Sequence, residues 1–238
     1  KNSDNGYRSR FNKEDEIAEP GYYCVNLLDD KIKAEMTVTS RVGFHRYTFP
    51  KNKPAHLLFD LQHGLGDNVI ESSIKIISQN EISGLRRSSG WAKDQYVYFY
   101  AKFSKPFSNF RITKDNTIQT QIDSITGTNI KSIFSFENLN DPLIVKVSLS
   151  AVNEKGAQMN MKREANTWDF DFIRQMALEK WEKELSIVKI KGGAIKDRIK
   201  FYTALYHSFI VPNIYHDVDG KYRGADLKIK TLSKNDSM

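Results

Sequence analysis

The sequence predicts a mainly β protein with helices at its C-terminal end. From residue 22 to residue 151, short segments of alternating apolar and polar residues are separated by turns. Strands that recur about every ten residues are typical of an antiparallel β-sandwich. Near Asn166 the apolar period changes from two to about 3.6, which predicts helices. We therefore expect a sandwich domain over 1–165, a helical connector over 166–210, and the start of a further helical domain over 211–238.

The strands are predicted from alternation and from the turn residues between them. Pro20-Gly21 and Asp29-Asp30 are turn sequences, and Pro50 and Pro54 bracket a loop. The expected strands are 22–27, 32–39, 42–49, 55–61, 72–79, 81–87, 96–103, 107–114, 118–122, 131–137 and 142–151. A further brief strand is expected over 187–190.

Two helices are predicted, near 169–186 and 194–210. Asn166 and Thr167 are capping residue types before the first. Gly192-Gly193 separates the two helices, and Pro212 cannot continue the second because it lacks a backbone N–H. The apolar residues of the second helix recur at helical spacing and form one face: Ile195, Ile199, Tyr202, Leu205, Tyr206 and Phe209.

Composition indicates a folded chain and excludes several functional classes. Hydrophobic residues make up 39% and aromatic residues 12%, enough for a packed core. The net charge is +7, but the basic residues are scattered singly, so we expect no nucleic-acid partner. Cys24 is the only cysteine, which excludes an intrachain disulfide. No apolar stretch reaches the roughly 18 residues of a transmembrane helix.

The first candidate site follows the second predicted helix. Six polar or aromatic residues fall within eleven positions, with Gly220 and Gly224 between them: His216, Asp217, Asp219, Tyr222, Arg223 and Asp226. Carboxylates and a guanidinium can line a polar pocket and form bidentate hydrogen bonds. The alternative is a solvated Asp-Gly turn. An EF-hand calcium loop is disfavoured, because the twelfth position carries no glutamate.

The second candidate site combines two loops of the predicted sandwich. Gly64 and Gly66 let the backbone approach a ligand closely, and His63 supplies a donor or acceptor. Trp91 stands on a glycine-flanked loop, where an indole ring can stack on a sugar. The alternatives are a simple hairpin connection for residues 62–67 and a plug of the sandwich end for Trp91.

Three stretches make the sequence resemble glycoside hydrolase family 92, the exo-acting α-mannosidases. They are GYYCVNLLDDKIKAEMTVTSRVGFHRYTFP at 21–50, SGLRRSSGWAKDQYVYFYAKFSKPF at 83–107 and FYTALYHSFIVPNIYHDVDGKYRGAD at 201–226. The resemblance implies an N-terminal β-sandwich and a connector that leads into an (α/α)6 barrel. We expect that barrel to be largely absent here and the extreme N-terminal part of the sandwich domain to be missing.

The resemblance also implies an activity. Family members remove terminal α-linked mannose with inversion and require calcium. The catalytic acid and base and the calcium ligands are expected beyond this chain, so no catalytic or metal-binding residue is assigned, and the isolated chain is expected to be inactive. The expected substrate-binding residues form the non-catalytic wall of the sugar site: His63, Gly64, Trp91, Asp217, Asp219, Arg223 and Asp226.

The expected partners are mannose-containing glycans, and the expected location is secreted, periplasmic or cell-surface, although the chain carries no signal peptide. The apolar face of the second helix predicts a homo-oligomer or pairing with the missing catalytic part. The alternative function is a stand-alone carbohydrate-binding or structural β-sandwich module without hydrolase activity.

Overall fold

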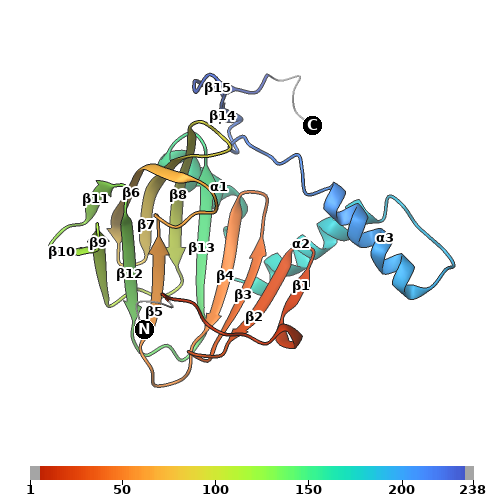
Figure 1. Ribbon diagram of the computed structural model, residues 1–238, viewed down its shortest axis with the longest axis horizontal. Helices are drawn as coiled ribbons and strands as arrows, with labels where there is room; N and C mark the ends of the chain where they lie inside the picture. The colour runs from red at the N-terminus through yellow and green to blue at the C-terminus, as the bar shows by residue number, and fades with distance from the viewer. Residues whose placement is uncertain (1–5, 234–238) are drawn as a thin grey trace.

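The structure is a computed structural model that describes residues 6–233. Two antiparallel β-sheets are packed together, and three helices follow them (Figure 1). The first five residues of the predicted sandwich domain and the last five of the predicted third domain lie outside the described residues.

The large sheet has nine strands in the order β1-β2-β3-β4-β13-β8-β7-β6-β11, and each neighbouring pair is antiparallel. Its strands are β1 (Ile17–Glu19), β2 (Tyr22–Leu27), β3 (Ile32–Val38), β4 (Val42–Thr48), β6 (Asn68–Ser78), β7 (Glu81–Ser89), β8 (Gln95–Phe103), β11 (Ser124–Gly127) and β13 (Leu143–Ser150).

The small sheet has four strands in the order β10-β9-β12-β5. They are β5 (Ala55–Asp60), β9 (Asn109–Lys114), β10 (Thr117–Gln119) and β12 (Ile130–Phe136). A separate hairpin near the C-terminus pairs β14 (Lys221–Arg223) with β15 (Ile229–Thr231). A short 3-10 helix, η1 (Lys13–Asp15), precedes β1.

A phenylalanine-rich core joins the two sheets. Phe103 of β8 is fully buried, and its ring centroid lies 5.4 Å from that of Phe134 in β12. Phe107 lies in the segment between β8 and β9, and its ring centroid is 5.0 Å from that of Phe134. Burying a side chain of this size stabilises the fold by about 1.5–3 kcal/mol. This shared core confirms the predicted antiparallel sandwich.

The opposite face of the large sheet is covered by helices α1 (Glu154–Glu164) and α2 (Phe170–Leu185) (Figure 1). Ala157 and Met161 of α1, and Phe170 and Ile173 of α2, join a second core cluster with residues of β2, β4 and β8. Asn153 accepts a hydrogen bond from Gly156 N at the start of α1, and Asp169 accepts one from Phe172 N at the start of α2. These side chains satisfy backbone donors that each helix leaves unpaired.

The eleven predicted strands between residues 22 and 151 and the two predicted helices are present, with boundaries shifted by a few residues, whereas the short strands β1, β11, β14 and β15 were not predicted. Helix α1 was not predicted. The sheets end at Ser150, so residues 154–164, placed in the sandwich domain from sequence, form a helix after the last sandwich strand. Its buried residues include Gly156 and Asn160, which carry no apolar signal. The prediction of a brief strand over 187–190 is wrong, because those residues form part of an irregular connection between α2 and α3.

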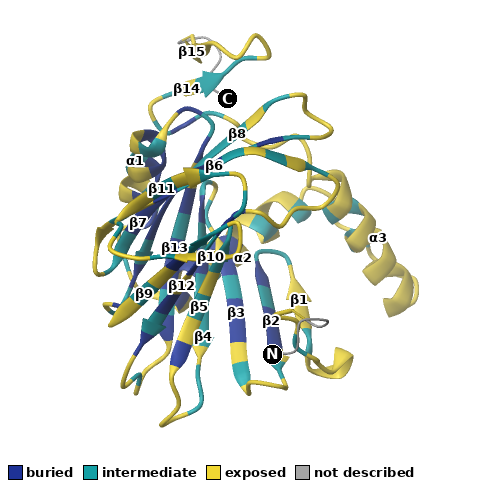
Figure 2. Ribbon diagram, turned by 60° about the vertical axis from the view of Figure 1, so that its left-hand side comes forward, coloured by how far each residue is buried: buried dark blue, intermediate teal, exposed yellow. Residues whose placement is uncertain are grey.

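Helix α3 (Ile195–Ser208) contains no buried residue (Figure 2). Ile195 and Ile199 are 68% and 61% exposed, which agrees with the apolar face predicted there. Tyr206 of this helix packs against α2, with its ring centroid 4.7 Å from that of Trp181, and Tyr202 donates to Val188 O over 3.0 Å. Among residues 6–233, no helix is long and apolar enough to cross a membrane.

A buried ion pair ties the sheet to α2. Arg46 of β4 donates to both carboxylate oxygens of Glu35 in β3, over 2.9 and 2.8 Å, and Tyr22 donates a third bond to Glu35 over 2.9 Å. Arg46 also donates to Asp171 at the start of α2 over 2.8 Å, and its guanidinium lies 4.2 Å from the centre of the Phe170 ring. The charge on Glu35 is therefore compensated although the residue is only 3% exposed.

This pair predicts an acid-sensitive contribution to stability. Burial raises the pKa of Glu35, but the hydrogen bonds from Arg46 and Tyr22 outweigh burial and lower that pKa to about 2 from 4.5. A carboxyl with a lowered pKa stabilises the fold fully above 4.5, and that stabilisation is lost as pH falls toward 2. Between pH 7 and pH 3 we expect a loss of about 2 kcal/mol from this group.

The measurement is the free energy of unfolding by denaturant at pH 7, 5 and 3, for the wild type and for Glu35→Gln. The variant should be less stable at pH 7, by about 3 kcal/mol, and the gap should narrow by about 2 kcal/mol at pH 3. Glu14→Gln, at an exposed position in η1, is the control and should leave the pH profile unchanged. A gap that is constant from pH 7 to pH 3 would show that Glu35 does not carry this dependence.

Candidate functional site

The predicted site residues come from two loops of the sandwich, one between the two sheets and one within the large sheet, and from the segment after α3. The loops are 61–67, which joins β5 to β6, and 90–94, which joins β7 to β8. The β14–β15 hairpin lies over the end of the large sheet at which β13 leads into α1 (Figure 1). The three segments are therefore gathered at one end of the sandwich.

The 61–67 loop is fixed by an arginine from the neighbouring strand. Arg86 of β7 donates to Leu61 O over 3.0 Å and to the two carboxylate oxygens of Asp67 over 2.5 and 3.2 Å. The hydrogen bonds from Arg86 have the largest effect on the Asp67 carboxyl and lower its pKa to about 2. At the start of the loop, Asp60 accepts hydrogen bonds from Gln62 N and His63 N over 2.8 and 2.9 Å. The loop is held at both ends before any ligand binds.

Gly64 leaves room for this ion pair. A Cβ atom at position 64 would lie 1.9 Å from Asp67 Oδ1 and 2.5 Å from Arg86 Nη2. Only glycine lets the backbone pass so close to the ion pair. The glycine therefore makes room for the pair formed by Asp67 and Arg86, whereas the sequence suggested that it lets the backbone approach a ligand.

Gly64 and Trp91 line one hollow of ≈ 330 Å³ between the two loops, whereas His63 is exposed and outside its lining. Trp91 is fully exposed, so it does not plug the end of the sandwich. Its loop is held by Arg87, which donates to both carboxylate oxygens of Asp94 over 2.7 and 2.6 Å. The hollow therefore presents an indole ring on a fixed backbone, which suits stacking against a sugar.

Asp217 is buried, with 3% of its surface exposed. Its Oδ2 accepts a hydrogen bond from Ser150 Oγ over 2.6 Å, and its Oδ1 accepts one from Asn160 Nδ2 over 2.8 Å. Asn160 Oδ1 in turn accepts from Val218 N over 2.9 Å. A Cβ atom on Gly156 would lie 2.2 Å from Asp217 Oδ2. Asp217 therefore anchors the segment after α3 to β13 and α1.

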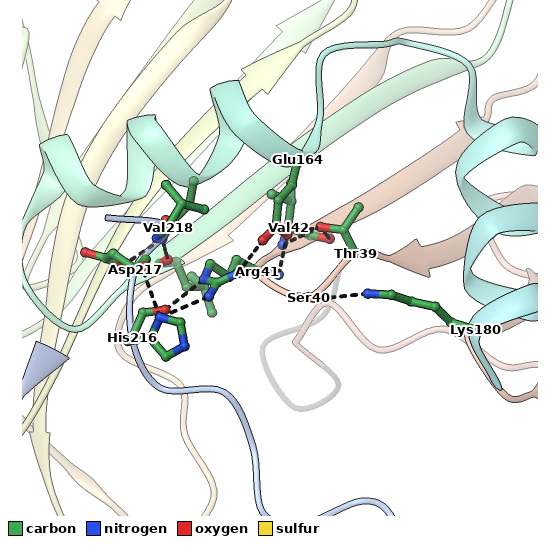
Figure 3. A network of polar contacts seen from close by, with 11 residues as sticks. Thr39, Ser40, Arg41, Val42, Glu164, Lys180, His216, Asp217 and Val218 are labelled. Atoms are coloured by element: carbon green, nitrogen blue, oxygen red, sulfur yellow. Dashed lines mark hydrogen bonds and ion pairs between the residues drawn. The ribbon is translucent and has the colours of Figure 1, made fainter. Parts of the chain in front are cut away.

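Arg41, in the turn between β3 and β4, adds a second anchor (Figure 3). It donates to His216 O over 2.7 Å and to Glu164 Oε1, at the end of α1, over 2.5 Å. Glu164 also accepts from Thr39 Oγ1 over 2.7 Å and from Arg41 N over 2.9 Å. The β3–β4 turn, the end of α1 and residue 216 are consequently joined in one network.

Arg223 attaches the hairpin to the sandwich. It donates to Ala151 O, Val152 O and Leu227 O over 2.9, 3.2 and 3.0 Å. Its guanidinium lies 4.1 Å from the centre of the Tyr96 ring, and that of Arg87 lies 4.8 Å from the same ring. Arg223 thus has a positioning role, and it links the hairpin to the Trp91 loop through Tyr96 and Arg87.

Asp219 and Asp226 lie on the exposed side of the hairpin. Asp219 is 2.8 Å from Lys221 Nζ and Asp226 is 3.1 Å from Lys230 Nζ. Asp219 Oδ1 also accepts from Lys221 N over 3.1 Å, and Asp226 Oδ1 from Lys228 N over 3.2 Å. The side chain of Asp219 is 28% exposed and that of Asp226 is 45% exposed, which also fits the turn interpretation of this segment, and their predicted contact with a sugar stays a prediction.

A second hollow of ≈ 220 Å³ lies beside the Trp91 hollow, and Gln95 lines both. Residues Arg41, Tyr96, Asn160 and Asp217 contribute to its wall. The structure therefore brings Gly64, Trp91 and Asp217 to two adjoining hollows, with Arg223 beside them, and leaves His63, Asp219 and Asp226 outside both linings.

The residues missed from sequence are those that build the walls. Asn160 lies in the unpredicted helix α1, and Arg41 in a turn without a motif, so neither carried a signal. Arg86 and Arg87, adjacent on a strand, point to different loops, as alternation along a strand predicts. Within residues 6–233, no three His, Cys, Asp or Glu side chains come together to hold a metal ion.

Comparisons with known proteins agree with this architecture. The profile of the glycosyl hydrolase family 92 N-terminal domain matches residues 1–150, and that of the family's catalytic domain matches residues 156–237. An uncharacterized secreted glycosidase of Arthroderma benhamiae is 25% identical over 87% of this chain and 31% of its own length.

Solved structures give the same result. A family GH92 α-mannosidase from Bacteroides thetaiotaomicron is similar over 97% of this chain, with 34% identity and a TM-score of 0.90, and the match covers 32% of that enzyme. An inverting mannosidase of the family from the same organism has the same fold, with a TM-score of 0.85 over 94% of this chain and 30% of its own, at 22% identity. The chain spans about a third of the length of these relatives.

The profile match over residues 1–150 and the fold agree with the resemblance read from the sequence. The chain therefore belongs to glycosyl hydrolase family 92, and it comprises the family's N-terminal β-sandwich domain and the start of its catalytic domain.

Proposed function

We propose that this chain is part of a calcium-dependent, inverting exo-α-mannosidase that acts on terminal α-linked mannose of glycans. The observation that carries the proposal is the 34% identity with an α-mannosidase over 97% of this chain. A second structure of that α-mannosidase is a complex with mannoimidazole. A mannose-containing glycan is accordingly the proposed ligand.

We assign the chain the non-catalytic wall of the sugar site. Trp91 supplies a stacking surface, and the loop around His63 and Gly64 supplies backbone groups beside it. Asp219 and Asp226 supply carboxylates that can accept hydrogen bonds from vicinal hydroxyls. Asp217 and Arg223 act indirectly, because their polar atoms bind Ser150, Asn160 and the carbonyls of residues 151–152.

The chemistry itself is proposed to depend on residues of the remaining catalytic domain. An inverting glycosidase needs a carboxylic acid that protonates the leaving oxygen and a carboxylate that activates water from the opposite side. We assign neither role within this chain. Calcium is proposed as a cofactor of the complete enzyme, held by residues of the remaining catalytic domain.

The alternative function is a carbohydrate-binding or structural module without hydrolysis. It is retained because this chain covers only 32% of the α-mannosidase that it matches.

We also propose that the exposed face of α3 is covered by the remainder of the catalytic domain or by a second copy of the chain. Secretion is proposed from the glycosidase relative described as secreted.

The first test is release of an aryl group from an aryl α-mannoside. The 238-residue chain alone should show no turnover, with or without calcium, because it lacks an assigned acid and base. The same chain joined to a complete family catalytic domain should hydrolyse the substrate, lose activity with a chelator and regain it with calcium. Calcium-dependent turnover by the chain alone would show that its carboxylates include the catalytic pair, and an inactive complete protein that still binds mannose would establish the alternative.

The second test concerns the hairpin. In the protein with a complete catalytic domain, Asp219→Ala should lower kcat/KM about 10²-fold, because a hydrogen bond to a charged group contributes about 1.5–3 kcal/mol. The melting temperature should hardly change, since the side chain of Asp219 bonds, among the described residues, to Lys221 two positions along the same turn.

The matched control is Asp141→Ala, which also removes an exposed aspartate near a lysine, at 3.8 Å from Lys105, but in the loop before β13. It should leave kcat/KM within about twofold. If Asp219→Ala instead keeps full kcat/KM and melts several degrees lower, the hairpin carboxylate is a turn-forming group and not a sugar ligand.

A further inference from the structure

A second concave site lies on the face of the large sheet that the helices cover. It is a cavity of ≈ 510 Å³ between α1 and strands β8 and β13. Its lining includes Lys102, Lys146, Lys155 and Lys162, together with Trp168, and none of the described lining residues is acidic. A cavity of this volume is within the range of small-ligand sites.

The fold forces these lysines together. Lys102 of β8 and Lys146 of β13 are direct cross-strand partners in the antiparallel register. Lys155 and Lys162 are seven positions apart in α1, which is two helical turns, so they lie on one side of that helix. Like charges placed directly opposite one another in a sheet are destabilising unless a counter-charge is present.

Lys102 has such a counter-charge, but Lys146 does not. Lys102 Nζ lies 2.7 Å from Glu81 Oε1. Lys146 is only 4% exposed, and within residues 6–233 it forms no ion pair with a carboxylate. Its Nζ donates to Ala165 O and Thr167 O over 2.8 and 3.2 Å and lies 3.8 Å from the centre of a Trp168 ring.

A buried ammonium without an anion is costly, because carbonyls and a ring replace its hydration only in part. Burial, followed by repulsion from Lys102, lowers the pKa of Lys146 to about 8. Lys155 and Lys162 are exposed and form no ion pair with a described residue. The cavity is therefore positively charged from its floor, which is Lys146, to its rim on α1.

We propose that this cavity binds a phosphate or sulfate group, either as the free ion or as the ester group of a small sugar. A tetrahedral oxyanion presents several acceptor oxygens, and ammonium groups from β13 and α1 can approach it from different sides as point charges. The cavity is larger than one such ion, so it also has room for an organic group attached to the ester.

This site is separate from the proposed sugar site. Gln95 marks the hollows at one end of β8, and Lys102 lies seven positions further along that strand. At about 3.3 Å per strand residue, Gln95 and Lys102 are ~23 Å apart, and the lysine cavity shares no lining residue with either hollow. A ligand at the lysine site therefore does not occupy the position proposed for the terminal mannose.

The test is isothermal titration calorimetry in a phosphate-free buffer at pH 7, with inorganic phosphate, inorganic sulfate, mannose 6-phosphate and methyl α-mannoside as separate probes. We expect saturable binding of phosphate or sulfate at one site per chain. Lys155→Gln/Lys162→Gln should weaken it at least about tenfold, because two of the charges that face the anion are removed.

The matched control is Lys51→Gln/Lys53→Gln, which removes the same charge from exposed positions in the loop before β5. Binding should stay within about twofold of the wild type. The ester is the ligand if mannose 6-phosphate binds more tightly than inorganic phosphate and Trp168→Ala abolishes only this difference in affinity. Equal affinities of the wild type for mannose 6-phosphate and inorganic phosphate identify the free ion as the ligand.

Two results would overturn the proposal. One is the absence of saturable anion binding to the wild type. The other is equal weakening by the two double variants, which would mean attraction to the overall positive charge. Both double variants alter only exposed side chains, and a thermal melt of each should match that of the wild type. Methyl α-mannoside should not displace phosphate, because it carries no charge.

Discussion

The buried carboxylate of Asp217 holds the chain after α3 against the sandwich, and the remainder of the candidate site depends on that contact. Its two oxygens accept from Ser150 at the end of β13 and from Asn160 in α1, so three separate segments meet at one carboxyl group. A buried polar group is tolerated when its hydrogen bonds are satisfied. Arg41 fixes the adjacent residue, His216, to the end of α1, and the β14–β15 hairpin then extends from a defined point.

Close backbone approach recurs throughout this end of the molecule. Gly156 makes room for Asp217, and Gly64 makes room for the pair formed by Asp67 and Arg86. Neither glycine is needed for an unusual backbone angle; each is needed because a methyl group would collide with a charged side chain. The sandwich is thus a rigid support whose loops and connector are held by arginine–carboxylate pairs, which leaves Trp91 free to face a ligand.

Local periodicity was sufficient to predict eleven of the sandwich strands, the helices α2 and α3, and the exposed apolar face of α3, but not the short strands β1, β11, β14 and β15. Helix α1 was not predictable in this way, because its buried side includes Gly156 and Asn160 in place of a continuous apolar stripe. The sequence also identified the segment that carries Asp217 and Arg223, but not the contacts that bury Asp217. Asp217 is bonded by Ser150 and Asn160, which are 67 and 57 residues away along the chain, so the sequence around Asp217 does not indicate that it is buried.

The most direct test of this account is hydrogen exchange in Gly156→Ala. Alanine is ordinarily preferred to glycine in a helix by up to about 1 kcal/mol, so α1 itself should not be weakened. A Cβ atom 2.2 Å from Asp217 Oδ2 must nevertheless expel the carboxylate. We predict that the amides of Asp217, Val218 and Gly220 lose protection while those of β8 and β13 keep it. Unchanged protection at Asp217 and Val218 would contradict the claim that this buried carboxylate positions the site.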